Sequence, residues 1–118
     1  MWLLTPEGFF SIVQKPADTA RGTLTVRARV ADDLENLRRT VLPTLGPTQA
    51  GLGTDYRFRA TAPREEVARA LGELALRTTY SNFKNEVAKR QGPQRAALYH
   101  EVWDVLYTLQ DTTPDTHP

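Results

Sequence analysis

The chain has 118 residues, of which 40% are hydrophobic and 25% are charged, and its formal net charge is +1. These values are typical of one globular domain, so any basic surface must arise from local segregation of charge. The absence of cysteine excludes a disulfide framework and a thiolate zinc site, and it is compatible with a cytoplasmic protein. No stretch approaches the roughly 20 apolar residues of a membrane span, so we expect no membrane partner.

The first half of the chain has the pattern of strands and one helix. Asp32, with Glu35 three residues later, is a candidate N-cap for that helix, and Pro43 ends it. Proline and glycine punctuate the segment that follows, which we expect to be a loop. The elements predicted here are strands at about 2–5, 9–15 and 23–30, a polar connection at 16–22, a helix from 32 to 42, a loop at 43–53 and a strand at about 54–62.

Two of these strands alternate apolar residues with arginine. Side chains alternate sides along a strand, so each has one apolar face and one basic face. The apolar sets are Leu24, Val26, Ala28 and Val30 in the first strand, and Tyr56, Phe58 and Ala60 in the second. The basic sets are Arg27 and Arg29, and Arg57 and Arg59. If both strands belong to one sheet, four guanidinium groups project from one surface.

Guanidinium groups on a sheet suit a phosphate-rich partner such as nucleic acid, because arginine binds phosphate with fixed, multiply donating geometry. The alternative is that these are ordinary solvated positions, paired across the strands with Thr25, Asp55 or Glu7.

The second half of the chain has the pattern of helices. Pro63, followed by Glu65 and Glu66, favours a helix start. Ser81 or Asn82 can cap a further helix that ends at Gly92. The last helix is predicted from Pro93 to about Gln110, followed by a disordered tail at 111–118. The order β-β-α-β-α-α predicts a single α+β domain at 1–110. Its three- to four-stranded, mostly antiparallel sheet is expected to carry helices on one face.

The helix that starts near residue 82 is rich in amides and cations and poor in apolar residues. Phe83 and Val87 alone give it a clear core-facing edge. Its polar residues extend the candidate anion-binding set or form an ordinary solvated face. These residues are Asn82, Lys84, Lys89 and Arg90.

The last helix has two apolar edges, which usually means that a helix packs against two things. One edge is aliphatic and consists of Leu98, Val102, Val105 and Leu109. The other is aromatic and consists of Tyr99, Trp103 and Tyr107. The aromatic edge is either buried within the monomer or forms the interface of a homodimer.

No motif in the chain identifies an enzyme, a cofactor site or a metal site. Its two serines are not in a nucleophile motif, and no histidine spacing suits a metal. His100 and Asp104 stand four apart on a helix, which most often means an exposed contact. A small enzyme would require a pocket that unites Tyr80, Asn82, Lys84 and His100, and this remains an alternative to a binding module.

Four blocks of sequence also suggest a relationship. They are GFFSIVQK at 8–15, GTDYRFRA at 53–60, YSNFKNEVAKRQG at 80–92 and YHEVWDVLY at 99–107. In this order the chain resembles a family of short, uncharacterised bacterial proteins. The resemblance implies a small bacterial cytoplasmic protein and transfers no activity or site residue.

Overall fold

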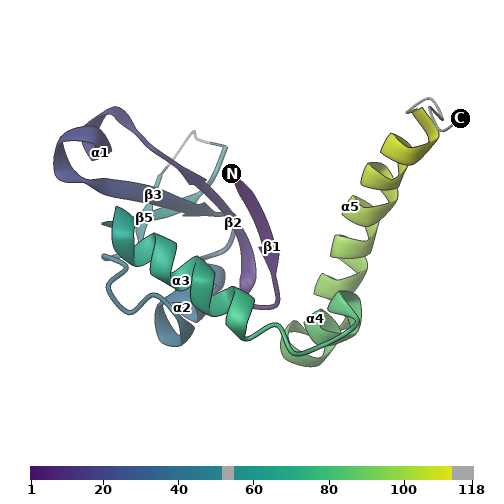
Figure 1. Cartoon of the computed structure of the whole chain (residues 1–118). Helices are drawn as coiled ribbons and strands as arrows, with labels where there is room; N and C mark the ends of the chain where they lie inside the picture. Colours follow the sequence, from purple (N-terminus) through teal and green to yellow (C-terminus); the bar gives the residue numbers. More distant parts are fainter. Residues whose placement is uncertain (52–54, 113–118) are drawn as a thin grey trace, which may run out of the picture. The chain divides into compact units, whose positions relative to one another are not determined.

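The computed structural model describes residues 1–51 and 55–112 and divides the chain into two compact units, residues 1–80 and 81–118. The first unit is an antiparallel sheet with three helices, and the second is a pair of helices (Figure 1). The α+β class predicted from the sequence is therefore confirmed. The prediction of one domain over residues 1–110 stays a prediction.

The sheet has five strands in the described part of the chain, rather than three or four, and every neighbouring pair is antiparallel. The additional strand has only two residues and lies in the segment that we expected to be a loop. There, Gly51 N donates to Arg57 O at 2.8 Å. In the order β1-β2-β3-β5-β4, the strands are β1 (Trp2–Thr5), β2 (Gly8–Val13), β3 (Thr23–Ala28), β5 (Phe58–Pro63) and β4 (Gln49–Ala50).

One face of the sheet forms the hydrophobic core of the first unit. Ile12, Val26 and Ala60 are register partners across β2, β3 and β5, and all three are buried. Two helices cover this face, α2 (Ala31–Thr40) and α3 (Arg64–Leu76). Their apolar stripes supply Leu34, Leu37, Val67 and Ala70 to the same cluster. The single-sided apolar pattern of the strands is thus explained by helices packed on one side.

The connection between β2 and β3 contains a short helix that we did not predict, α1 (Pro16–Arg21). Proline suits the first helical turn because its missing N–H would have no intrahelical acceptor there. The Asp18 carboxylate accepts a hydrogen bond from Lys15 N at 2.8 Å. Gly22 ends the helix with φ 66°, a left-handed conformation that favours glycine. The helix was not predicted because the segment is polar and lacks an apolar stripe, and the residues that stabilise it lie at its two ends.

Two predicted boundaries were wrong in the first unit. Helix α2 begins at Ala31 with Val30 as its N-cap, so Asp32 is not the cap. Strand β5 begins at Phe58 rather than near residue 54, so Tyr56 lies outside the strand alternation. Asp33, the third residue of α2, is buried, and its Oδ2 accepts from Phe9 N at 3.0 Å. The start of α2 is therefore stabilised by a hydrogen bond from β2, and no side-chain capping bond is present at Val30.

The second unit is a helical hairpin of α4 (Phe83–Gln91) and α5 (Pro93–Thr112). Asn82 caps α4 as predicted, since its Oδ1 accepts from Asn85 N at 2.8 Å. Gly92 separates the helices with φ 97°. Helix α5 continues two residues beyond its expected end, and the rest of the predicted tail, 113–118, lies outside the described residues. Within the described chain, no helix combines the length and apolarity that a membrane crossing requires.

Candidate functional site

The register of the sheet places Arg27 and Arg59 directly opposite one another on neighbouring strands. Both side chains lie on the face that α2 and α3 leave uncovered, because their neighbours Val26 and Ala60 point into the core. We call this surface the open face. The row that crosses it consists of Trp2, Ser11, Arg27, Arg59 and Gln49. The predicted pairing of the two arginine-bearing segments in one sheet is therefore present.

The arginines of the open face are held by neutral oxygen atoms. Arg27 Nη2 donates to Ser11 Oγ at 2.6 Å, and Arg29 Nη1 donates to the backbone carbonyl of Asp55 at 2.5 Å. Arg59 Nη2 donates to the carbonyl of Tyr56 at 3.4 Å. These bonds orient the guanidinium groups but leave their positive charges uncompensated.

Within residues 1–51 and 55–112, no carboxylate forms an ion pair with Arg27, Arg29, Arg57 or Arg59. Asp18 lies near the end of this face, but its carboxylate accepts from Thr23 and Thr25 at 2.5 and 2.7 Å. In addition, Nε of Arg27 and of Arg59 is buried and donates to no acceptor in the described chain. Buried donors without partners lower stability. The open face therefore has both positive charges without a carboxylate and N–H groups without an acceptor in the described chain.

Tyr56 packs against the arginines instead of entering the core. We expected it to share the apolar face with Phe58, but the chain bends at residues 55–57, before β5 starts. The guanidinium carbons of Arg27 and Arg29 lie 4.5 and 4.3 Å from the Tyr56 ring centroid. Only 5% of Tyr56 is exposed. Attraction between the cations and the ring therefore fixes the position of both arginines.

Two further aromatic residues lie on the open face that the sequence analysis did not single out. Trp2 is 70% exposed, and its ring meets Phe9 edge to face at a centroid distance of 5.8 Å. Phe9 in turn lies 6.4 Å from the Tyr56 ring. Strand alternation in Trp2-Leu3-Leu4 and in Phe9-Phe10-Ser11 could have placed Trp2 and Phe9 on one face. That prediction requires the register of β1 against β2, which local sequence does not give.

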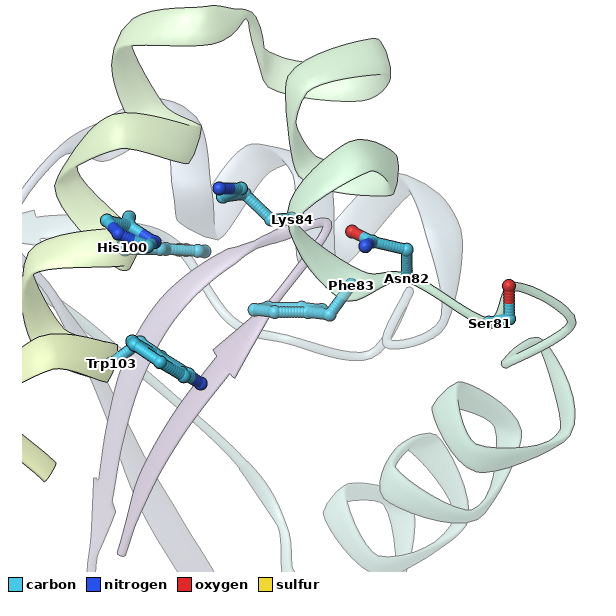
Figure 2. Close-up of a pocket in the computed structure, with 7 residues that line it drawn as sticks. Ser81, Asn82, Phe83, Lys84, His100 and Trp103 are labelled. Atoms are coloured by element: carbon cyan, nitrogen blue, oxygen red, sulfur yellow. The ribbon is translucent and has the colours of Figure 1, made fainter. Parts of the chain in front are cut away.

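The other predicted site residues lie in the second unit. Asn82, Lys84 and His100 line one pocket, so the structure brings these three predicted residues together (Figure 2). Tyr80 does not line the pocket and belongs to the first unit. Lys89 and Arg90 lie in the last turn of α4 and do not line it. His100 Nε2 is 3.7 Å from Asp104 Oδ2 on the same helix.

The three predicted interface aromatics of α5 have different environments. Tyr99 is 6% exposed and stacks on Phe83 at 5.8 Å with 5° between the ring planes, so it belongs to the core of the hairpin. Trp103 and Tyr107 remain exposed. Of the three aromatic residues, only Trp103 and Tyr107 can therefore contact another molecule while the two helices stay packed together.

Comparisons of the chain with protein-family models, with curated proteins and with solved structures gave no match in any of the three. The resemblance to short bacterial proteins thus stays a prediction. Among the described residues, no three histidine, cysteine, aspartate or glutamate side chains cluster closely enough to hold a metal ion. The candidate sites are therefore defined by their own geometry alone.

Proposed function

We propose that the open face of the sheet binds single-stranded nucleic acid without catalysing a reaction. The observation that carries this proposal is the cross-strand pair of Arg27 and Arg59, which has no carboxylate partner in the part of the chain that the structure describes. Like charges directly opposite one another in a sheet are destabilising. A bound phosphate would turn this repulsion into two charge-assisted hydrogen-bonding contacts.

The aromatic residues beside the arginines favour a single strand over a duplex. Unpaired bases stack on exposed aromatic rings, whereas the bases of a duplex are already stacked on each other. Trp2, on the same cross-strand row as Arg27, offers an exposed ring for this contact.

Arg29 is exposed and extends the positive surface beside Tyr56. Arg57 is also exposed, but it precedes β5, and its guanidinium carbon lies 5.6 Å from the ring centroid of Phe58, which packs against the core. The expectation that Arg57 shares the face of Arg59 is therefore not supported, because the strand alternation begins only at Phe58.

We expect the double variant Arg27→Gln/Arg59→Gln to bind a labelled single-stranded oligonucleotide about tenfold or more weakly than the unmodified chain, because two charged phosphate contacts are lost. The measurement is fluorescence anisotropy across a salt series, with single- and double-stranded DNA and RNA. Removing two contacts should also reduce the slope of log affinity against log salt by about 1.4 for a single strand.

The matched control is Arg64→Gln/Arg69→Gln, which removes the same charge from helix α3. Arg64 donates to Gln14, and Arg69 pairs with Glu66 at 3.1 Å, so neither belongs to the open face. Equal weakening in both double variants would show attraction to net charge alone. Affinity that does not change with salt would contradict the proposal outright.

The exposed residues of α5 favour a second candidate function, a homodimer through this helix. Val105 and Leu109 are 67% and 61% exposed. With Leu98 and Val102 they repeat at i, i+4, i+7 and i+11, which is the spacing of a coiled-coil seam. Trp103 and Tyr107 would flank that seam as aromatic anchors.

For this candidate, the change Leu109→Lys is expected to shift the sedimentation coefficient of the chain from that of a dimer to that of a monomer. A lysine in the seam would bring a charge into an apolar contact. Leu76→Lys is the control, because Leu76 is also exposed, at 78%, but lies at the end of α3. An unmodified chain that sediments as a monomer at every concentration would eliminate the dimer.

A further inference from the structure

The second unit contains a pocket of about 350 Å³ between the start of α4 and the first turns of α5 (Figure 2). All of the residues that line it belong to this unit. They are Ser81, Asn82, Phe83, Lys84, Tyr99, His100 and Trp103. The open face belongs to the other unit, so occupancy of the pocket does not depend on nucleic-acid binding there.

The polar groups of this pocket are mainly donors. The Lys84 ammonium and the Trp103 indole N–H donate to no acceptor in the described chain. Figure 2 shows Lys84 extending from α4 toward His100, with the indole nitrogen on the Trp103 edge that points toward Phe83. The Oδ1 atom of Asn82 accepts from Asn85 N at 2.8 Å, which leaves its NH₂ group to donate elsewhere. No carboxylate is among the lining residues, so the site favours an acceptor-rich anion.

The apolar groups of the pocket are flat rings from both helices. Phe83 and Tyr99 stack at 5.8 Å with 5° between their planes. His100 and Trp103 stack at 5.4 Å with 12° between their planes. Walls of this kind favour a planar ligand, because aromatic rings gain most from offset or edge contacts with another ring.

We propose that this pocket binds a mononucleotide, a phosphate joined to a planar heteroaromatic ring. The phosphate would contact Lys84 and the Asn82 amide at the N-terminus of α4, where the helix dipole also favours negative charge. The ring would lie against Phe83 and Trp103. Small-molecule sites generally occupy about 300–1,000 Å³, so the volume suits one nucleotide rather than a longer segment.

The test uses Trp103 as its own reporter. The chain has two tryptophans, so Trp2→Phe in the full-length protein leaves Trp103 as the only indole fluorophore. We expect adenosine monophosphate to change this fluorescence saturably. In the same background, Lys84→Met should weaken the affinity about tenfold or more, since a charge-assisted contact is lost.

The matched control is Lys89→Met, which removes the same charge from the same helix but outside the pocket. The affinity of this variant should stay within about twofold of the background, because Lys89 does not line the pocket and makes no contact with the ligand. Adenosine and inorganic phosphate, titrated separately, should each bind at least about tenfold more weakly than the nucleotide, because each lacks one set of contacts. A non-saturable signal, equal losses in the two lysine variants, or phosphate binding as tightly as the nucleotide would each overturn the proposal.

Discussion

Replacing Gly8 with alanine is expected to lower the free energy of unfolding by about 3 kcal/mol, through overpacking and a weakened buried hydrogen bond. A Cβ atom at this position would lie 2.5 Å from Cγ of Asp33, which is itself buried. Asp33 cannot move aside without losing its 3.0 Å contact from Phe9 N. Chemical denaturation monitored by circular dichroism measures the change.

Gly72→Ala is the matched control for this substitution. Gly72 lies inside α3, and a Cβ atom there would meet nothing within 4 Å. Alanine in a helix interior is favoured over glycine by about 0.5–1 kcal/mol, so this variant should be stabilised. An unchanged free energy of unfolding for Gly8→Ala would contradict the close contact between Gly8 of β2 and Asp33 of α2.

Asp18→Ala is expected to lower the free energy of unfolding by about 2–3 kcal/mol, because the carboxylate accepts charge-assisted hydrogen bonds that no other group replaces. The donors are Thr23, Thr25 and the backbone N–H of Lys15. Thr25 is buried, so its hydroxyl would be left without this acceptor. Asp32→Ala is the control, because Asp32 is exposed in the first turn of α2 and should change the stability by about 0.5 kcal/mol or less.

The effect of Asp18 should also depend on pH. Burial raises the pKa of its carboxyl, but hydrogen bonds from Thr23, Lys15 N and Thr25 and the charge of Arg21 outweigh burial and hold the pKa below its usual value of 3.8. A folded-state pKa below the unfolded value means that the stabilisation is complete above the unfolded pKa and is lost as pH falls through the folded pKa. The difference between Asp18→Ala and the unmodified chain should therefore shrink below about pH 4. A constant difference down to lower pH would contradict this role.

Local patterns in the sequence predicted most of the secondary structure and the positions of Arg27 and Arg59 on the open face. Alternation along β3 and β5 placed Arg27 and Arg59 on the uncovered side, and the register then made them direct neighbours. The Asn82 cap was also visible, because capping depends on residues three positions apart.

Features that depend on contacts between distant segments were not predictable in this way. Tyr56 leaves the core face because the chain bends before β5, and the benefit of that bend is its contact with arginines nearly thirty residues earlier. The role of Trp2 required the pairing of β1 with β2. Asp18 lies in the segment predicted as a polar connection, and its role as an acceptor was not predictable because it depends on the position of Thr25 in the sheet.

The pocket of the helical hairpin was predicted in part. Asn82, Lys84 and His100 were grouped by their chemistry, and the structure places them around one cavity. Tyr80 was grouped with them, but it does not line the pocket. Trp103 was assigned to an interface, whereas its indole edge also borders the pocket, because successive turns of α5 carry both surfaces.

The central claim is that Arg27 and Arg59 of the open face contact nucleic acid, and the most direct measurement is an NMR titration of the arginine side-chain Nε–Hε resonances with a single-stranded oligonucleotide. We predict that the Arg27 and Arg59 signals shift progressively and saturate. Those of Arg64 and Arg69 on helix α3 should stay in place. Resonances of Arg27 and Arg59 that do not move while the oligonucleotide binds, or that move no more than those of α3, would contradict the claim.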